Sequence, residues 1–418
     1  MTAAPRVSGA TSRILARLRP QKERLPRDIK VMLAAAFLIA LGFGLVAPVL
    51  PQFATTFGVG NTEASVIVAI FAFMRLVFAP AGGSLIGRLG ERPVYVAGLL
   101  IVALSTAACA FARDYWQLLL FRGLGGAGSV MFTVASMALV IRLAPPESRG
   151  RVSGAYASAF LIGNVCGPIV GGLLAGFGLR IPFLAYAAAL VVAAVVVQTQ
   201  LSHERRGPAG EQQRDPAMKL GEALATGAYR AALMSSFANG WAAFGVRMAT
   251  VPLFAAAAFG AGPEAAGLAL AVFAAGNAVA LTVSGRLADS VGRKPMMISG
   301  LLVAAASTAG IGFAGELAWF LAASALAGVG SGLFGPAQQA AVADVIGNGR
   351  SGGKVLAVYQ MTSDVGAIVG PVLAGVLADR LGYGWAFGVT GGIMLVAACT
   401  WLGTRETLRT GLRTADGR

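Results

Sequence analysis

Long apolar stretches separated by short polar segments dominate the pattern of this chain. A helix that spans a bilayer needs about 20 apolar residues at about 1.5 Å each. The pattern predicts an all-α membrane protein with twelve such helices. They cover residues 31–54, 63–83, 93–113, 116–142, 153–176, 182–201, 229–257, 264–286, 295–314, 317–343, 355–378 and 384–404. The first stretch exceeds the roughly 7–15 apolar residues of a signal peptide and no small-residue cleavage site ends it, so we expect it to remain as a helix.

The second half of the chain repeats the pattern of the first half. Pro51 corresponds to Pro252 at an offset of 201 residues, and GPIVGGLLA from Gly167 corresponds to GPVLAGVLA from Gly370 at an offset of 203. Parallel six-helix repeats are typical of transporters whose site lies between two halves. We therefore expect two pseudo-symmetric six-helix bundles. The chain divides into a tail over 1–30, a first half over 31–201, a linker over 202–227, a second half over 228–404 and a tail over 405–418.

Composition and charge support a membrane protein and orient it. Of the 418 residues, 56% are hydrophobic and 12% are charged, about half the charged share of a soluble domain, which excludes a cytosolic enzyme and a disordered chain. The net charge is +15, yet 27 of the 33 Lys and Arg residues lie in the termini and in alternate loops on the same side. Basic loops face the cytoplasm, so we expect both termini there, in the plasma or inner membrane, and no nucleic-acid partner.

Residues that carry enzyme chemistry are scarce. The three cysteines lie in apolar stretches without metal-ligand spacing, and the single histidine, His203, lies in a polar stretch. The chain has no phosphate-binding loop of the Walker type. We therefore expect no enzymatic activity, no metal site and no cofactor.

Glycines line one face of the fifth predicted helix. Gly163, Gly167 and Gly171 recur at every fourth residue, which makes a groove for close approach of another helix. Pro168 removes a backbone hydrogen bond and permits a bend, and Gly172 completes the pattern GNVCGPIVGGLL. Ordinary small-residue packing is the alternative, and under either interpretation the role is conformational.

The loop after the eighth predicted helix combines glycines with opposite charges. Its residues are Gly285, Leu287, Ala288, Asp289, Gly292, Arg293 and Lys294. The glycines allow a tight turn, and the charges can form pairs that break when the cytoplasmic side opens. The corresponding loop after the second helix departs from it, with Gly87 in place of the aspartate and Glu91 in place of a basic residue. A solvated basic loop is the alternative.

These segments resemble the major facilitator superfamily, and within it the twelve-span drug/proton antiporters, over residues 31–404. The fifth helix matches the antiporter signature, and the loop from Gly285 matches the gating loop of the family. The first helix matches the pattern of drug antiporters, although a kinked packing helix explains it equally well; the matching residues are Leu41, Gly42, Pro48 and Pro51. The resemblance implies the major facilitator fold and transport driven by a proton gradient.

The fourth helix, LLLFRGLGGAGSV, resembles the family's proton-coupling motif around Arg122. At 100° per residue, a small and polar stripe lies on one side of this helix. It consists of Arg122, Gly126, Ser129, Thr133 and Ser136. A charge inside the membrane costs about 2.5–3.5 kcal/mol on insertion scales, so Arg122 is a candidate for proton coupling. The alternative is an arginine satisfied by carbonyls or reaching the membrane surface.

Asp364 in the eleventh helix is the one acid that we place well within a span. Arg75 in the second helix lies about 12 Å from the cytoplasmic end, and Asp364 about 13–14 Å from the same side. In the family fold these two helices face each other across the halves. Our hypothesis is that Arg75 and Asp364 pair between halves and that protonation of Asp364 loosens the pair. A permanent structural ion pair is the alternative.

The seventh helix carries a third arginine inside the membrane, Arg247. We place it in a substrate cavity between the halves with Asn239 and Trp241, together with Ser129 and Thr133 of the fourth helix. The alternative for Arg247 is pairing with backbone. Two arginines and few acids in such a cavity favour neutral or anionic substrates at least as much as cations.

The sequence thus predicts a proton-coupled transporter that exports small amphipathic or hydrophobic compounds, with a small molecule, protons and lipid as partners and a monomer as the working unit. Two alternatives stay open. One is a proton-coupled importer of a metabolite on the same fold, and the other is a membrane sensor or assembly partner without transport activity.

Overall fold

The structure, a computed structural model, describes residues 26–143, 149–201, 218–260, 262–347 and 352–408. Twelve of the helices, or runs of continuous helix, in these ranges are long and apolar enough to cross a membrane. The first half contains α2 (Arg27–Val46), α3 (Leu50–Thr55), α4 (Asn61–Leu89), α5 (Glu91–Ala110), α6 (Tyr115–Leu143), α7 (Arg149–Ala175) and α8 (Ile181–Gln200). The second half contains α9 (Leu220–Ala225), α10 (Gly227–Asn239), η2 (Gly240–Val246), α11 (Arg247–Phe259), α12 (Pro263–Ser290), α13 (Arg293–Ile311), α14 (Leu317–Ile346), α15 (Gly353–Leu381) and α16 (Tyr383–Leu402).

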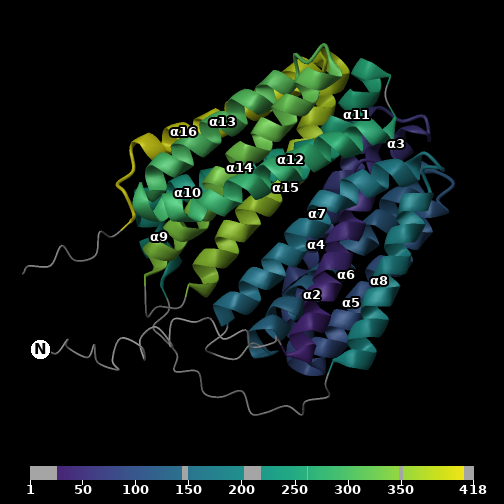
Figure 1. Ribbon diagram of the computed structural model, residues 1–418, viewed down its shortest axis with the longest axis horizontal. Helices are drawn as coiled ribbons and strands as arrows, with labels where there is room; N and C mark the ends of the chain where they lie inside the picture. The colour runs from purple at the N-terminus through teal and green to yellow at the C-terminus, as the bar shows by residue number, and fades with distance from the viewer. Residues whose placement is uncertain (1–25, 144–148, 202–217, 261, 348–351, 409–418) are drawn as a thin grey trace, which may run out of the picture.

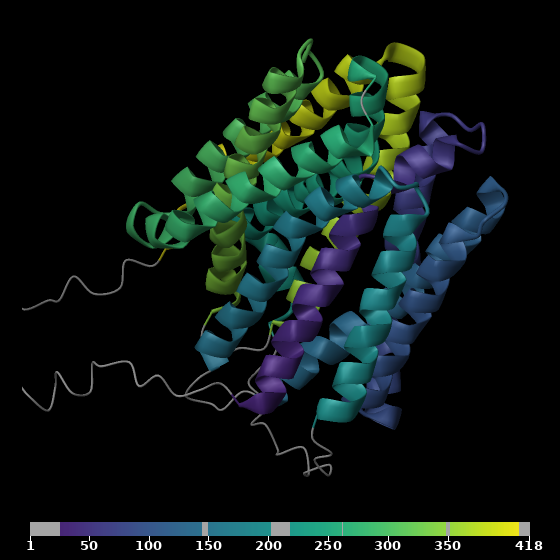
Figure 2. The same ribbon diagram turned by 45° about the vertical axis from the view of Figure 1, so that its right-hand side comes forward.

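The long helices form two bundles, as expected from the repeat. Figure 1 shows α2 to α8, purple to teal, in one bundle and α10 to α16, green to yellow, in the other, and Figure 2 shows the same helices from a second direction, in which the two bundles overlap. The described residues contain helices and no strand, so the predicted all-α fold class is confirmed. The bundles touch mainly through two pairs of helices, α4 with α15 and α7 with α12.

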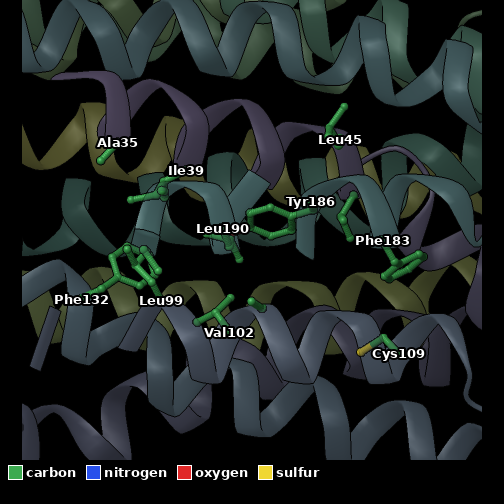
Figure 3. Close-up of a cluster of buried hydrophobic side chains, with 14 of the residues drawn as sticks. Ala35, Ile39, Leu45, Leu99, Val102, Cys109, Phe132, Phe183, Tyr186 and Leu190 are labelled. Carbon is green, nitrogen blue, oxygen red and sulfur yellow. The ribbon is translucent and has the colours of Figure 1, made fainter. Parts of the chain in front are cut away.

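Each bundle has its own apolar core. In the first half, buried side chains of α2, α5, α6 and α8 meet between the helices, and Figure 3 shows Ile39, Leu99, Phe132 and Tyr186 among them. Two further sets of buried side chains fill the second half, and Trp401, near the end of α16, is completely buried in one of them. The clusters share a few residues where the halves meet, such as Leu253 with the first-half core and Ala47 with second-half side chains, but most of each interior comes from its own half, which allows each half to move as a unit.

Three predicted stretches differ in detail from the helices. The stretch over 31–54 is broken after Val46, because Pro48 lacks a backbone N–H and its ring obstructs the preceding turn. The stretch over 229–257 is continuous but π-helical from Gly240 to Val246. Within the stretch predicted as a linker, residues 220–225 form the short helix α9, whose Ala223 is fully buried, while residues 202–217 lie outside the described ranges.

Candidate functional site between the two halves

The glycines of α7 hold α2 at backbone distance. A Cβ atom on Gly163 would lie 2.7 Å from the Phe37 carbonyl oxygen, and one on Gly171 would lie 2.3 Å from the Leu45 carbonyl oxygen. Gly167 sits between them, where its own Cβ would lie 2.7 Å from the Cα of Gly44. This is the close approach that the glycine spacing predicts, since any larger side chain would push the two helices apart.

The other side of α7 crosses to the second half of the molecule. A Cβ on Gly172 would lie 3.0 Å from the Cα of Glu264, in the first turn of α12. A Cβ on Gly267, also in α12, would lie 2.4 Å from the Pro168 carbonyl oxygen. The glycine–proline segment of α7 therefore packs against α2 with one face and against α12 of the opposite half with another. The glycine spacing alone predicts the first contact but not the second.

The repeat places a matching crossing on the other side of the interface. A Cβ on Gly375 of α15 would lie 2.8 Å from the Cα of Thr62, in the first turn of α4. Nearby, Nε2 of Gln52 in α3 donates a hydrogen bond to the Pro252 carbonyl in α11, at 3.1 Å. Both crossings lie at the end of the bundles where α4 and α12 begin. We call this end the contact end, and the opposite end, where α4 ends and α15 begins, the linker end.

Arg75 and Asp364 lie on α4 and α15, two helices that meet across the halves, but they form no ion pair in this structure. Nη1 of Arg75 donates to the Ser129 hydroxyl of α6 at 2.7 Å, within its own half. The Asp364 carboxylate accepts a hydrogen bond from Nε2 of Gln360 at 3.3 Å, one turn earlier in α15. The predicted Arg75–Asp364 pair is therefore not formed in this conformation, and each group keeps a hydrogen-bond partner within its own half.

Arg122 is buried inside the first half. Its guanidinium carbon lies 4.2 Å from the centre of the Phe71 ring in α4, and its side chain is 7% exposed. Its Nε has no hydrogen-bond partner among the described groups. No ion pair of Arg122 with an acid is found among the described residues. A cation over an aromatic ring in a desolvated place gains about 2 kcal/mol, which offsets part of its burial cost.

The rest of the polar stripe on α6 forms a chain of hydrogen bonds. The Thr133 hydroxyl donates to the Ser129 carbonyl at 2.7 Å, and the Ser136 hydroxyl donates to the Thr133 carbonyl at 2.9 Å. Ser136 also accepts a hydrogen bond from the Tyr156 hydroxyl of α7, at 3.3 Å. Ser129 is the member that contacts Arg75, so the stripe joins the two arginine-bearing helices of the first half.

Arg247 repeats the arrangement of Arg122 in the second half. Its guanidinium carbon lies 3.3 Å from the centre of the Phe273 ring, its side chain is 5% exposed, and Nη1 has no described partner. Phe273 and Phe71 are related by the repeat offset of 202 residues. The sequence analysis did not identify either ring, although the repeat relates them. Each phenylalanine also lies against a glycine at an equivalent position: the Phe273 carbonyl oxygen against Gly328, and the Phe71 carbonyl oxygen against Gly126.

The prediction that Trp241 lines a substrate cavity is wrong. Its indole is 4% exposed and donates to the Thr390 hydroxyl of α16 at 3.1 Å. Its backbone and ring pack on Gly370 of α15. The side chain therefore lies in the interior of the second half, because the missing side chain at Gly370 of α15 leaves room for the large ring. Asn239, two residues earlier in the chain, is partly exposed at the junction between α10 and η2.

The charges of the predicted gating loop pair within the second half. Arg293 contacts Asp289 at 2.5 Å and Asp344 of α14 at 3.3 Å. Lys294 donates to the Leu402 and Thr404 carbonyls after α16, at 2.7 and 3.0 Å. In the predicted loop, Gly292 has a positive φ of 117°, which favours glycine. A Cβ atom on Gly285 would have no neighbouring atom within 4 Å, so packing does not require glycine there. These pairs tie α12, α13, α14 and the end of α16 together, and the two halves meet elsewhere.

Comparisons with known proteins place this architecture in context. The family model described as Major Facilitator Superfamily matches residues 32–248 and 232–417. Multidrug resistance protein 2 of Bacillus subtilis (strain 168) is 27% identical over 381 residues, which cover 88% of this chain and 92% of that protein. Quinolone resistance protein NorA of Staphylococcus aureus (strain Mu50 / ATCC 700699) is 29% identical over 194 residues, 46% of this chain and half of that protein's length.

Solved structures share the fold at low identity. A bacterial homologue of the human lysosomal transporter Spinster superimposes with a TM-score of 0.78 at 18% identity, covering 90% of this chain and 96% of that one. A D-xylose–proton symporter gives a TM-score of 0.74 at 16% identity, covering 91% and 98%. At these identities the structural likeness concerns the fold alone.

Proposed function

Because this chain belongs to the major facilitator superfamily, we propose that it is a proton-coupled transporter that exports small amphipathic or hydrophobic compounds by alternating access. The family and the multi-pass membrane architecture are the premises. Two observations favour export over the other activities that this fold carries. The first is the intact glycine–proline segment of α7, and the second is the multidrug and quinolone resistance named for two relatives.

We propose that the linker end faces the cytoplasm. The basic residues of the chain concentrate in the termini and in the loops on that side, and basic loops are retained in the cytoplasm. The contact end then faces outwards. With the inter-half contacts gathered there, the described conformation is one in which the halves meet on the extracellular side.

The observation that carries the coupling mechanism is the placement of Arg75 and Asp364 on α4 and α15, helices of opposite halves that contact each other. In the conformation described, Arg75 uses Ser129 of its own half as its hydrogen-bond partner. When the halves close at the linker end, Asp364 is the anionic partner for Arg75 on the opposite side. A proton on Asp364 removes that attraction and favours reopening, so one proton biases the rocking motion in a defined direction.

The charges inside the spans bear on the class of substrate. Away from their ends, the described spans contain three arginines (Arg75, Arg122 and Arg247) and one aspartate, Asp364. A permanently cationic compound would meet net repulsion there, whereas a neutral or anionic compound would not. We therefore place neutral, zwitterionic and anionic amphipathic compounds ahead of obligate cations as substrates.

The test is transport in vesicles with an imposed proton gradient, using a quinolone and a permanently cationic dye of similar size. Wild-type protein should move the quinolone against the proton flux. Asp364→Asn should lose most of the proton-driven accumulation, at least tenfold in rate, while keeping gradient-independent exchange. Glu316→Gln, a change to an exposed acid at the start of α14, is the matched control and should retain wild-type transport.

Three results would contradict the proposal in different ways. Full proton-driven transport by Asp364→Asn with an unchanged pH dependence would remove Asp364 from coupling. Movement of substrate in the same direction as protons would make the protein an importer. No substrate-dependent proton flux with any compound would favour a sensor or assembly partner.

A further inference from the structure

The end of α15 carries a carboxylate that reaches into the opposite half. Asp379 accepts hydrogen bonds from the backbone N–H groups of Asn61 and Thr62 in the first turn of α4, at 3.1 and 2.9 Å. It also accepts bonds from the side chains of the same residues, Asn61 Nδ2 at 2.8 Å and the Thr62 hydroxyl at 2.6 Å. The Tyr383 hydroxyl of α16 adds a bond to Asn61 Oδ1 at 2.8 Å. Five hydrogen bonds therefore join the two halves at this place.

The sequence of α4 explains why the cap comes from another part of the molecule. The residue before the helix is Gly60, which has no side chain to accept a bond from the first N–H groups. Glu63 bonds to the N–H of Gly60 at 3.0 Å and leaves those of Asn61 and Thr62 free for another acceptor. The start of a helix carries partial positive charge and unpaired donors, which a carboxylate satisfies better than any neutral group. Asp379 supplies that carboxylate.

The repeat shows that this cap is particular to one of the two crossings. At the offset of 203 residues, Asp379 corresponds to Gly176 at the end of α7, which has no carboxylate. At the offset of 202, Asn61 corresponds to Pro263, which has no N–H to donate. Among the described residues, the crossing of α7 with α12 therefore has no equivalent of this cap, whereas the crossing of α4 with α15 adds a charged, directional contact.

We propose that Asp379 is a latch that holds the halves together at the contact end and so sets how often the transporter opens to the outside. Opening at this end separates α15 from α4 and replaces the five bonds with water. Because the site is exposed, the net effect of losing them is a modest shift in population, roughly threefold to tenfold. This inference rests on the alternating-access part of the proposed function and on the proposed orientation.

The buried hydroxyl of Ser65 provides a reporter for opening. Ser65 is completely buried in the α4 surface under α15, where a Cβ on Gly375 would lie 2.9 Å from its oxygen, and the hydroxyl has no hydrogen-bond partner among the described groups. A cysteine in its place is nearly isosteric and becomes reachable only when the two helices separate. Its alkylation rate by a membrane-impermeant maleimide then measures the open population even when that population is small.

The experiment uses the full chain in oriented vesicles, with Cys109, Cys166 and Cys399 replaced and Ser65→Cys introduced, without substrate and without a proton gradient. Asp379→Asn should raise the alkylation rate roughly threefold to tenfold. Asp114→Asn is the matched control, since Asp114 also caps a helix start, at 2.9 Å from the Gln117 N–H, but within a single half. It should leave the rate unchanged. Phe177→Cys, 80% exposed, reports the access of reagent and should react equally in every background.

A double-mutant cycle keeps the proposal falsifiable if one variant folds poorly. Thr62→Val removes one donor from the α4 side, so it should raise the rate by a smaller factor than Asp379→Asn does. Combining the two should add little to Asp379→Asn alone, because the contact is already broken. An unchanged rate in Asp379→Asn, or equal effects from Asp379→Asn and Asp114→Asn, would overturn the latch. Since neither protons nor substrate enter the assay, this outcome is independent of whether proton-coupled export is correct.

Discussion

At the scale of single residues, the cations inside this protein are held by neutral groups. Arg122 and Arg247 lie over Phe71 and Phe273, and Arg75 donates to Ser129. None of these three arginines forms an ion pair with an acid in the described part of the chain. A neutral partner lowers the cost of burial without cancelling the charge. These side chains therefore remain able to attract an anionic group when the halves rearrange.

Glu406, after α16, shows a different use of charge. Burial raises the pKa of its carboxyl, but backbone N–H groups of Leu408, Lys294, Arg293 and Thr407 outweigh that effect, and the net pKa lies below the ordinary value. Two of these N–H groups begin α13, at 3.0 and 3.1 Å from the carboxylate. Glu406 therefore caps α13 from the end of the chain's second half.

We predict that Glu406→Gln lowers stability by about 1 kcal/mol near neutral pH, the usual value for a lost helix cap. A lowered folded-state pKa stabilises the fold above the ordinary glutamate pKa near 4.5, and that contribution is lost as the pH falls through the folded-state value. The difference in thermal midpoint between variant and wild type should thus shrink below about pH 4. Glu316→Gln, at a helix start where its side chain makes no capping bond, is the control. A difference that persists at low pH would contradict the capping role.

At the scale of elements, α7 has two main packing partners, one in each half. It packs against α2 through Gly163, Gly167 and Gly171, and against α12 through Pro168 and Gly172. The two contacts lie on different sides of the helix. A change on the first side affects the assembly of one bundle, and a change on the second affects how the bundles meet.

We predict that Gly167→Val prevents normal packing of the first half. Its Cβ would lie 2.5 Å from the Leu41 carbonyl oxygen and 2.7 Å from the Cα of Gly44, and backbone atoms at that distance cannot move away independently. Overpacking of this kind costs about 1–3 kcal/mol or more, so the yield of monodisperse protein and the thermal midpoint should fall. Gly388→Ala in α16, where a Cβ meets nothing within 4 Å, should leave both unchanged or slightly improved. A normal thermal midpoint and yield of Gly167→Val would show that α2 and α7 can separate enough to admit the larger side chain.

The seventh membrane segment illustrates how neighbours modify a helix. From Gly240 to Val246 it widens into π-helix, next to Arg247. A Cβ on Gly240 would lie 1.9 Å from the Ser363 carbonyl oxygen, so α15 presses directly on this backbone. Single-turn π segments are often found at functional sites, and this one lies between Asn239 and Arg247.

At the scale of the whole molecule, the repeat produces two equivalent crossings that hold the contact end. Gly172 with the start of α12 and Gly375 with the start of α4 are related by an offset of 203 residues. If each bundle moves as a unit, both crossings open and close together. Disturbing one crossing should then be detectable at the other.

We predict that Gly267→Leu, which drives a side chain against the Pro168 carbonyl at the first crossing, raises the alkylation of Ser65→Cys at the second crossing by at least threefold. The physical reason is rigid-body motion of two bundles with separate cores. Gly388→Leu in α16, where a Cβ meets nothing within 4 Å, is the control for altered helix propensity. An effect of Gly267→Leu confined to its own crossing would show that the bundles deform locally.

Much of this architecture follows from the amino-acid order. Spans of about 20 apolar residues leave a helix as the structure that satisfies its own backbone inside a bilayer, so the number and order of the helices are readable from the chain. Glycine spacing in α7 is equally readable, because every fourth residue lies on one face. The six-helix repeat identified the two halves and, with the motifs, the family to which the chain belongs.

Which partner each buried group takes was decided by the tertiary structure. The sequence contains Arg75, Ser129 and Asp364 but no indication that the arginine bonds to the serine in this conformation. Trp241 reads as a cavity residue from its position in the span, and the glycines of α15 place it in the core. The contacts of Asp379 depend on two helices 318 residues apart in the chain meeting at their ends. Periodicity specifies the face of one helix, whereas contacts between helices depend on how the bundles pack and on which end they close.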